Sequence, residues 1–271
     1  MKNGRIQAAL CVAAVILSAC SVREDREECP CRVNVNLDDF AGTECRRGVL
    51  TVIGPLLHLQ DSVSAEDCFG RGYDVEVRRT GNSFSYVAGC GSLILSSDSL
   101  YCEKGSEWGE VTLGFRREHC NADMVKVRLS PRKEFCTVNF IFMGTGPDEE
   151  AGCRILVRSG CVGLSLGDGG ALKGEYEAYA RLSAESGTFS VRVPRQPDDG
   201  LAAVLLACGG KNDAGADEEI DTLPIGKMME ANGYDWTKES LDDVFITIDA
   251  TQREISVEVK PWNDRPLDIE I

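Results

Sequence analysis

The sequence has 271 residues, a formal net charge of −15 and 43% hydrophobic residues. Its length fits one large or two ordinary globular domains. The negative charge argues against a nucleic-acid partner, because phosphate binding needs a basic surface. We expect no cofactor.

The N-terminus combines a basic start with an apolar run. Lys2 and Arg5 precede apolar residues over 6–19. The run is roughly 14 residues long, shorter than the ~17–25 of a spanning helix. It ends in Leu17-Ser18-Ala19-Cys20, which resembles the lipobox of bacterial lipoproteins. That resemblance implies a signal peptide over 1–19 and lipidation of Cys20. The alternative is an ordinary signal peptide with an incidental cysteine.

Residues 20–32 are predicted to form a lipidated acidic tether, because 21–28 carry almost no apolar side chains. Acidic residues close behind a lipidated cysteine resemble the surface-export signal of certain Gram-negative lipoproteins. A simple polar spacer is the alternative. Two or more acyl chains make anchoring stable, so we expect a protein held in the outer membrane by its lipid, at the cell surface.

Period-two alternation begins at Val33, where Val33, Val35 and Leu37 alternate with polar residues. This is the pattern of a half-buried strand. Short runs of the same kind recur between turn-rich stretches, at 49–53, 73–78, 84–88, 111–115 and 125–129. Strands at this spacing indicate a β-sandwich or barrel, and we interpret 33–130 as a β-sandwich.

The polar stretch Ser130-Pro131-Arg132-Lys133 is the predicted boundary to a second β-sandwich over 131–271. Its expected strands are 136–142, 153–157, 188–193, 201–207, 244–249 and 254–259. The last two form a predicted hairpin. A short helix is expected at 225–231, ended by Asn232-Gly233, and a mobile acidic loop at 209–221. The predicted fold is all-β, with two tandem sandwiches and no fixed-period sequence repeat.

Cysteine is unusually abundant, with 13 in the chain. Setting aside Cys11 in the signal peptide and Cys20 leaves 11, and an exported chain can form disulfides. Several of the others occupy apolar positions within strand-like runs, namely Cys136, Cys153, Cys161 and Cys208. We expect a few disulfides, several buried thiols, no metal site and a core that survives reduction.

Several motifs, taken in order, resemble those of one known family. They are Cys29-Pro30, 33–37, Val193-Pro194-Arg195-Gln196-Pro197, Leu223-Pro224-Ile225-Gly226, Asn232-Gly233-Tyr234-Asp235, Leu241-Asp242-Asp243 and 255–259 with Trp262. The chain resembles the FimB/Mfa-like family of fimbrial anchor lipoproteins, the minor subunits that root type V pili. The resemblance implies two transthyretin-like Greek-key sandwich domains. It also implies a non-enzymatic role in pilus anchoring and assembly, with pilin subunits as partners. Family members are commonly poorer in cysteine.

Two other function classes were weighed. Gly163-Leu164-Ser165-Leu166-Gly167 fits the nucleophile-elbow pattern, which needs a strand-turn-helix context and a histidine later in the chain. Both histidines precede Ser165, so no catalytic residue is assigned. A surface lipoprotein that binds glycan or host protein is the main alternative to a pilus subunit. Trp108, Trp236 and Trp262 are its possible sugar platform, although buried structural aromatics are the default interpretation.

The C-terminal end supplies the candidate contact strand toward a pilin. The lipid would hold the N-terminus, whereas the C-terminus is free to reach a neighbour by strand exchange. The candidate residues are Ile255, Val257, Val259, Trp262, Leu267, Ile269 and Ile271. The alternative is that this tail completes the sandwich of its own molecule.

Overall fold

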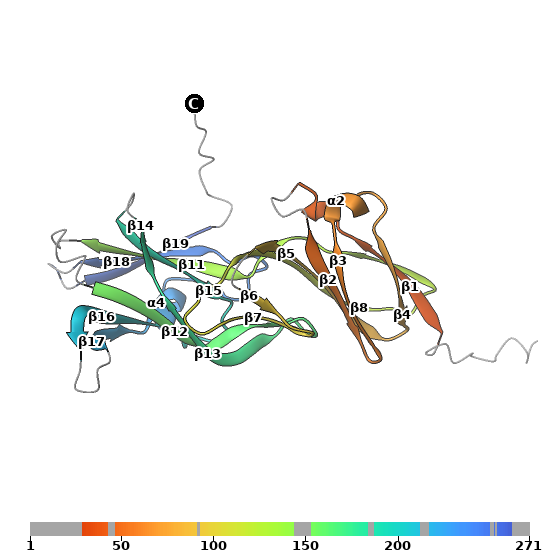
Figure 1. Ribbon diagram of the computed structural model, residues 1–271. Helices are drawn as coiled ribbons and strands as arrows, with labels where there is room; N and C mark the ends of the chain where they lie inside the picture. Colours follow the sequence, from red (N-terminus) through yellow and green to blue (C-terminus); the bar gives the residue numbers. More distant parts are fainter. Residues whose placement is uncertain are drawn as a thin grey trace, which may run out of the picture.

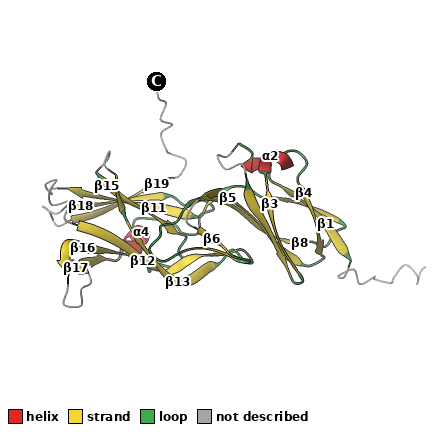
Figure 2. Cartoon of the chain, viewed as in Figure 1, coloured by secondary structure: helices red, strands yellow, loops and turns green. Residues whose placement is uncertain are grey.

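The computed structural model describes residues 29–42, 47–90, 93–143, 153–183, 187–211, 217–249, 252 and 254–261. The predicted signal peptide, Cys20 and most of the tether lie outside this part. Trp262, Leu267, Ile269 and Ile271 also lie outside it. Two lobes built almost wholly of strands lie end to end (Figures 1 and 2). The predicted all-β sandwich fold is confirmed, whereas the division into two tandem domains at residue 130 stays a prediction.

The first lobe contains two sheets around one hydrophobic core. One sheet has the order β4 (Tyr73–Arg78), β1 (Pro30–Asn36), β9 (Met124–Arg128). The other has the order β10 (Arg132–Lys133), β8 (Glu110–His119), β5 (Gly81–Cys90), β2 (Gly48–Gly54), β3 (Leu57–Val63). A 3-10 turn, η1 (Asp38–Phe40), and a one-turn helix, α2 (Ala65–Cys68), complete this lobe.

The second lobe also contains two sheets, with α4 (Ile225–Ala231) beside them. One has the order β14 (Arg181–Ser183), β15 (Thr188–Pro194), β11 (Phe135–Met143), β18 (Asp243–Asp249), β19 (Glu254–Lys260). The other has the order β17 (Asp217–Leu223), β16 (Ala202–Lys211), β12 (Cys153–Ser165), β7 (Ser99–Cys102), β6 (Leu93–Leu95). β13 (Ala171–Tyr179) pairs with β12 off this path.

Both lobes use one strand arrangement, although no sequence repeat is visible. β1 runs antiparallel to β4 and parallel to β9. β11 likewise runs antiparallel to β15 and parallel to β18. In each lobe, the first long strand is therefore a central strand, held on both sides.

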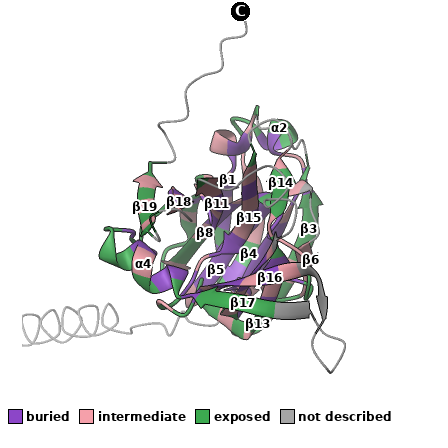
Figure 3. Cartoon of the chain, turned by 90° about the vertical axis from the view of Figure 1, so that its left-hand side faces the viewer, coloured by how far each residue is buried: buried purple, intermediate pink, exposed green. Residues whose placement is uncertain are grey.

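Alternation along β1 explains why this strand forms and which way it faces. Cys31, Val33 and Val35 are fully buried, whereas Arg32 is exposed and Asn34 is half-buried. Burying a valine side chain contributes ~1.5–3 kcal/mol. A shift by one residue would reverse the two faces, so the pattern determines the register. Figure 3 shows buried residues concentrated inside the sheets.

The hairpin β6–β7 packs in the second lobe, although its sequence lies between two strands of the first lobe. It lies between β5 and β8 in the sequence, yet β7 pairs with β12 of the second lobe. Leu100, Cys102 and Trp108 accordingly belong to the core of the second lobe. Residues 93–108 fall within the range predicted for the N-terminal sandwich, and their strands were too short to be recognised.

The structure corrects the predicted mobile loop at 209–221 over 209–211 and 217–221, whereas 212–216 lie outside the described residues. β16 continues to Lys211, and β17 begins at Asp217 and pairs with it. Acidic side chains are tolerated there because β17 is an edge strand that faces solvent on one side. The predicted hairpin of the last two strands is confirmed, since β18 and β19 pair antiparallel; residues 250, 251 and 253 between them lie outside the described part.

Candidate functional site

β19 is an edge strand of its sheet. It pairs with β18 in the register Val244↔Val259, Ile246↔Val257 and Ile248↔Ile255. The hairpin is closed by the Gln252 backbone amide, which donates to Asp249 Oδ1 at 3.0 Å. Within the described part of the chain, no strand pairs with the other side of β19. An edge strand of this kind can accept a further strand on its outer side.

The side chains of β19 divide cleanly between two faces. Ile255, Val257 and Val259 are half-buried and pack against the core of their own lobe. Glu254, Ser256, Glu258 and Lys260 are exposed. The Lys260 ammonium lies 4.0 Å from the centre of the Phe245 ring, a cation–π contact that joins the hairpin strands on their outer face.

The structure brings three of the seven predicted contact residues together. Ile255, Val257 and Val259 form one row on β19, at the rim of the core. Trp262, Leu267, Ile269 and Ile271 lie outside the described residues. A further strand paired with β19 could pack every second side chain against this apolar row.

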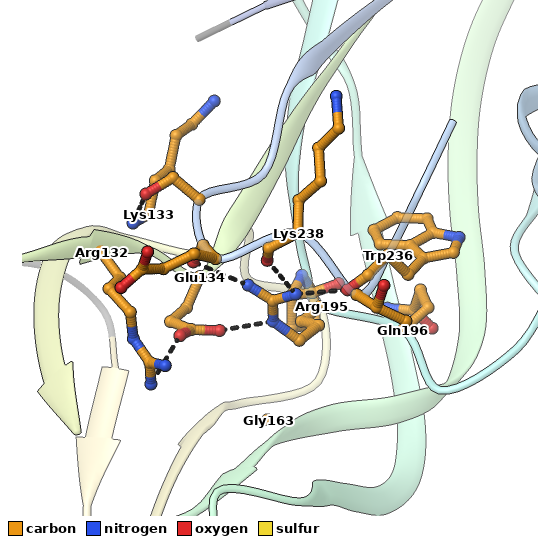
Figure 4. Close-up of polar contacts among 12 residues, drawn as sticks. Arg132, Lys133, Glu134, Gly163, Arg195, Gln196, Trp236 and Lys238 are labelled. Atoms are coloured by element: carbon orange, nitrogen blue, oxygen red, sulfur yellow. Dashed lines mark hydrogen bonds and ion pairs between the residues drawn. The ribbon is translucent and has the colours of Figure 1, made fainter. Parts of the chain in front are cut away.

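A buried polar cluster positions the segment that leads into β18 (Figure 4). Arg195 Nε donates to Glu134 Oε2 at 2.6 Å, and Arg132 Nη2 lies 3.2 Å from Glu134 Oε1. The Arg195 guanidinium also donates to the carbonyl oxygens of Trp236, Lys238 and Glu239. One planar group thus ties β15 to the start of β11 and to the loop after α4.

A second buried pair continues this cluster at the first residue of β18. Lys133 Nζ pairs with Asp243 Oδ1, and that oxygen also accepts the Thr137 backbone amide at 2.8 Å. The Leu241 amide donates to the Lys133 carbonyl at 3.0 Å. Buried charges are tolerated where they are paired and hydrogen-bonded. Together these contacts determine where β18 begins and hence where β19 lies.

Three of the sequence motifs behind the family resemblance meet at or beside this cluster. Arg195 comes from the Val193–Pro197 motif and binds the carbonyl of Trp236, just after the Asn232–Asp235 motif. Tyr234 Oη donates to the Asp242 carbonyl at 3.1 Å. Sequence reasoning recognised these motifs but missed that Arg195 and Glu134 pair, because partners far apart in sequence have no local signal.

The buried thiols and tryptophans bear on the other function classes. Burial raises the pKa of the Cys102 and Cys136 thiols to about 12, so neither is poised as a nucleophile near neutral pH. Ser165 ends β12 and is followed by a turn, not by the helix of a nucleophile elbow. Trp108 and Trp236 are buried, so neither presents a face to a sugar.

No family model matches the chain, and no curated protein does. Solved structures do match. The fimbrial anchor protein Mfa2 of Porphyromonas gingivalis has a TM-score of 0.53 at 8% identity, covering 86% of this chain and 97% of that one. The chain has the fold of this fimbrial protein.

Two Bacteroides structures match at the same level. A proposed polysaccharide-binding protein of Bacteroides thetaiotaomicron has a TM-score of 0.54 at 10% identity, covering 87% of this chain and 100% of that one. A proposed adhesin of Bacteroides ovatus has a TM-score of 0.53 at 10% identity, covering 84% and 90%. The likeness covers 84–87% of this chain, and at these identities it establishes the fold.

Proposed function

We propose that the protein is an outer-membrane lipoprotein that anchors or helps to assemble a fimbrium. It would be held by the lipid on Cys20 and would pair with pilin subunits by β-strand exchange near its C-terminus. The observation that carries this proposal is the fold shared with a fimbrial anchor protein over 86% of the chain. No enzymatic activity is part of it.

The outer edge of β19, which no other described strand pairs with, supports strand exchange as the mode of contact. Main-chain hydrogen bonds would supply affinity, and the row of Ile255, Val257 and Val259 would supply pockets for alternate side chains. The predicted tail could occupy this region in two ways. It could extend into a neighbouring subunit as a donor strand, or it could complete its own lobe.

A surface lipoprotein that binds glycan or host protein is the second candidate. It is favoured by the likeness to a proposed polysaccharide-binding protein. Burial of Trp108 and Trp236 removes two of the three tryptophans weighed for a sugar platform. Co-purification from native membranes separates the candidates. Recovery of pilin subunits supports the anchor, whereas their absence together with glycan retention supports the alternative.

Replacing Cys20 by alanine is expected to release the protein from the membrane, because the acyl chains would have no attachment site. No described helix is long and apolar enough to cross a membrane. Membrane fractionation measures the effect, with Cys29→Ala as the control, since it removes an exposed thiol nine residues later. If the Cys20→Ala protein stays with the outer membrane through a high-salt wash, another segment holds it there.

Deleting residues 264–271 is expected to abolish pilus retention while leaving the protein folded, if the tail is a donor strand. Pili retained on cells and the thermal melt of the purified protein are measured together. A misfolded product would assign the tail to its own core, and normal pilus retention would contradict the donor hypothesis.

A matched pair of tail variants separates the two faces of the predicted strand. Replacing Leu267, Ile269 and Ile271 by serine should lose pili, because a donor strand inserts its apolar side chains. Replacing Asp268 and Glu270 by their amides should retain them. Equal loss in both would indicate that no face of the tail enters a groove.

A further inference from the structure

Two buried thiols meet in the first lobe. Cys31 lies in β1, Cys120 follows the last residue of β8, and both are fully buried in the same core. Their side chains interact with each other, and Cys31 Sγ donates to the Arg32 carbonyl oxygen at 3.7 Å. Both are free thiols in the structure.

The backbone around both residues is held in place. Cys31 pairs with Val77 of β4. The Cys120 amide donates to the carbonyl of Thr80, in the turn that follows β4, at 3.0 Å. Both cysteines are therefore packed against one end of β4. Two cysteines held next to each other in this way can reach the disulfide S–S separation of about 2.05 Å if their side chains rotate and the backbone shifts slightly.

We propose that Cys31 and Cys120 form a disulfide in the exported protein. The inference rests on the predicted export of the chain and not on a fimbrial role. It selects one pairing among many that the sequence leaves open. The bond would close a loop of about 90 residues, for which loop closure predicts substantial stabilisation of the folded state.

The chemistry is thiol–disulfide exchange with an oxidant that itself carries a disulfide. One cysteine thiolate attacks the oxidant, forming a mixed disulfide and releasing one oxidant thiol. The second cysteine then displaces the other oxidant sulfur. Two thiols of the chain are oxidised, and one disulfide of the oxidant is reduced to two thiols. Because both side chains are buried in the folded lobe, the oxidant reaches them before folding is complete.

The surroundings also favour this pair. Burial raises the pKa of the Cys31 thiol, and the nearby Arg79 guanidinium opposes this by stabilising the thiolate. Arg79 is held in place by its ion pair with Asp123. Burial raises the pKa of Cys120 to about 11, so in the folded lobe Cys120 is a poor leaving group, which slows reduction of the bond by an external thiolate.

The test is refolding of the full chain in a mixture of reduced and oxidised glutathione. Remaining thiols are alkylated in denaturant without reduction, and the digest is examined by mass spectrometry. We expect a cross-linked peptide pair that contains Cys31 and Cys120. Recovery of both residues as singly alkylated peptides from folded, oxidised protein would overturn the proposal, as would linkage of either one to a different cysteine.

A second readout does not depend on peptide recovery. Reduction should lower the thermal midpoint of the oxidised wild type by an amount on the order of 10 °C, while the protein stays folded at room temperature. Cys31→Ser and Cys120→Ser should each abolish this difference, whereas Cys68→Ser, a buried cysteine in the same core, should keep it. An identical midpoint with and without reductant would contradict the disulfide.

Discussion

Replacing Arg195 by alanine is expected to lower the free energy of unfolding by about 1.5–3 kcal/mol, the usual contribution of a hydrogen bond to a charged group. Glu134 would lose its 2.6 Å partner inside the protein and keep only Arg132. The carbonyl groups that Arg195 caps in the loop after α4 would also lose their donor. Urea denaturation of the purified protein measures the change.

Two further variants distinguish the effect of the Arg195 contacts from the effects of its charge and of losing any ion pair. Arg195→Lys keeps the charge but lacks the planar fork that reaches several acceptors at once, so an intermediate loss is expected. Lys104→Ala removes an exposed ion pair with Glu175 at 3.2 Å and should leave the unfolding midpoint unchanged. If Arg195→Ala behaves like Lys104→Ala, the cluster in Figure 4 does not hold the lobe together.

Gly163→Ala is expected to lower the free energy of unfolding by about 2–4 kcal/mol through overpacking. A Cβ atom at Gly163 would lie 2.0 Å from the Leu100 carbonyl oxygen and 2.8 Å from Tyr101 Cα. Both are backbone atoms of β7, so neither can rotate away. The β6–β7 hairpin would have to move off β12, and amide hydrogen exchange over 93–102 should rise.

Gly160→Ala is the matched control on the same strand. Nothing lies within 4 Å of a Cβ atom built there, so the variant should unfold close to the wild-type midpoint. Equal destabilisation by the two changes would mean that the loss reflects glycine in β12 generally. It would then not reflect the close approach of β7.

Local sequence patterns correctly predicted the elements whose alternation or end signal lies within the element itself. β4 and α4 begin and end at the residues expected from alternation and from the Asn232-Gly233 stop. β13 was missed because its only buried side chains, Tyr176 and Ala178, come near its end. β12 runs past its expected end at Val157 because Gly160 and Gly163 interrupt the apolar pattern without ending the strand.

The same distinction, between local sequence patterns and long-range arrangement, applies to the candidate site. The alternation of Ile255, Val257 and Val259 is readable in the sequence, and β19 forms where it was expected. That β19 is an edge strand depends on the order of the whole sheet, which no local pattern contains. The pairing of Arg195 with Glu134 joins residues 61 positions apart, and many alternative partners exist among the 44 acidic residues of the chain.

The central position of β1 has a mechanical consequence. A pull on the chain that precedes Cys29 acts along β1, which is paired at six positions with β4 and at five with β9. Tension in that direction loads the ladders on both sides in shear, so many hydrogen bonds must fail together. An edge strand pulled sideways would lose them one by one. In a protein tethered at this end, β1 would therefore be the last part to unfold under tension.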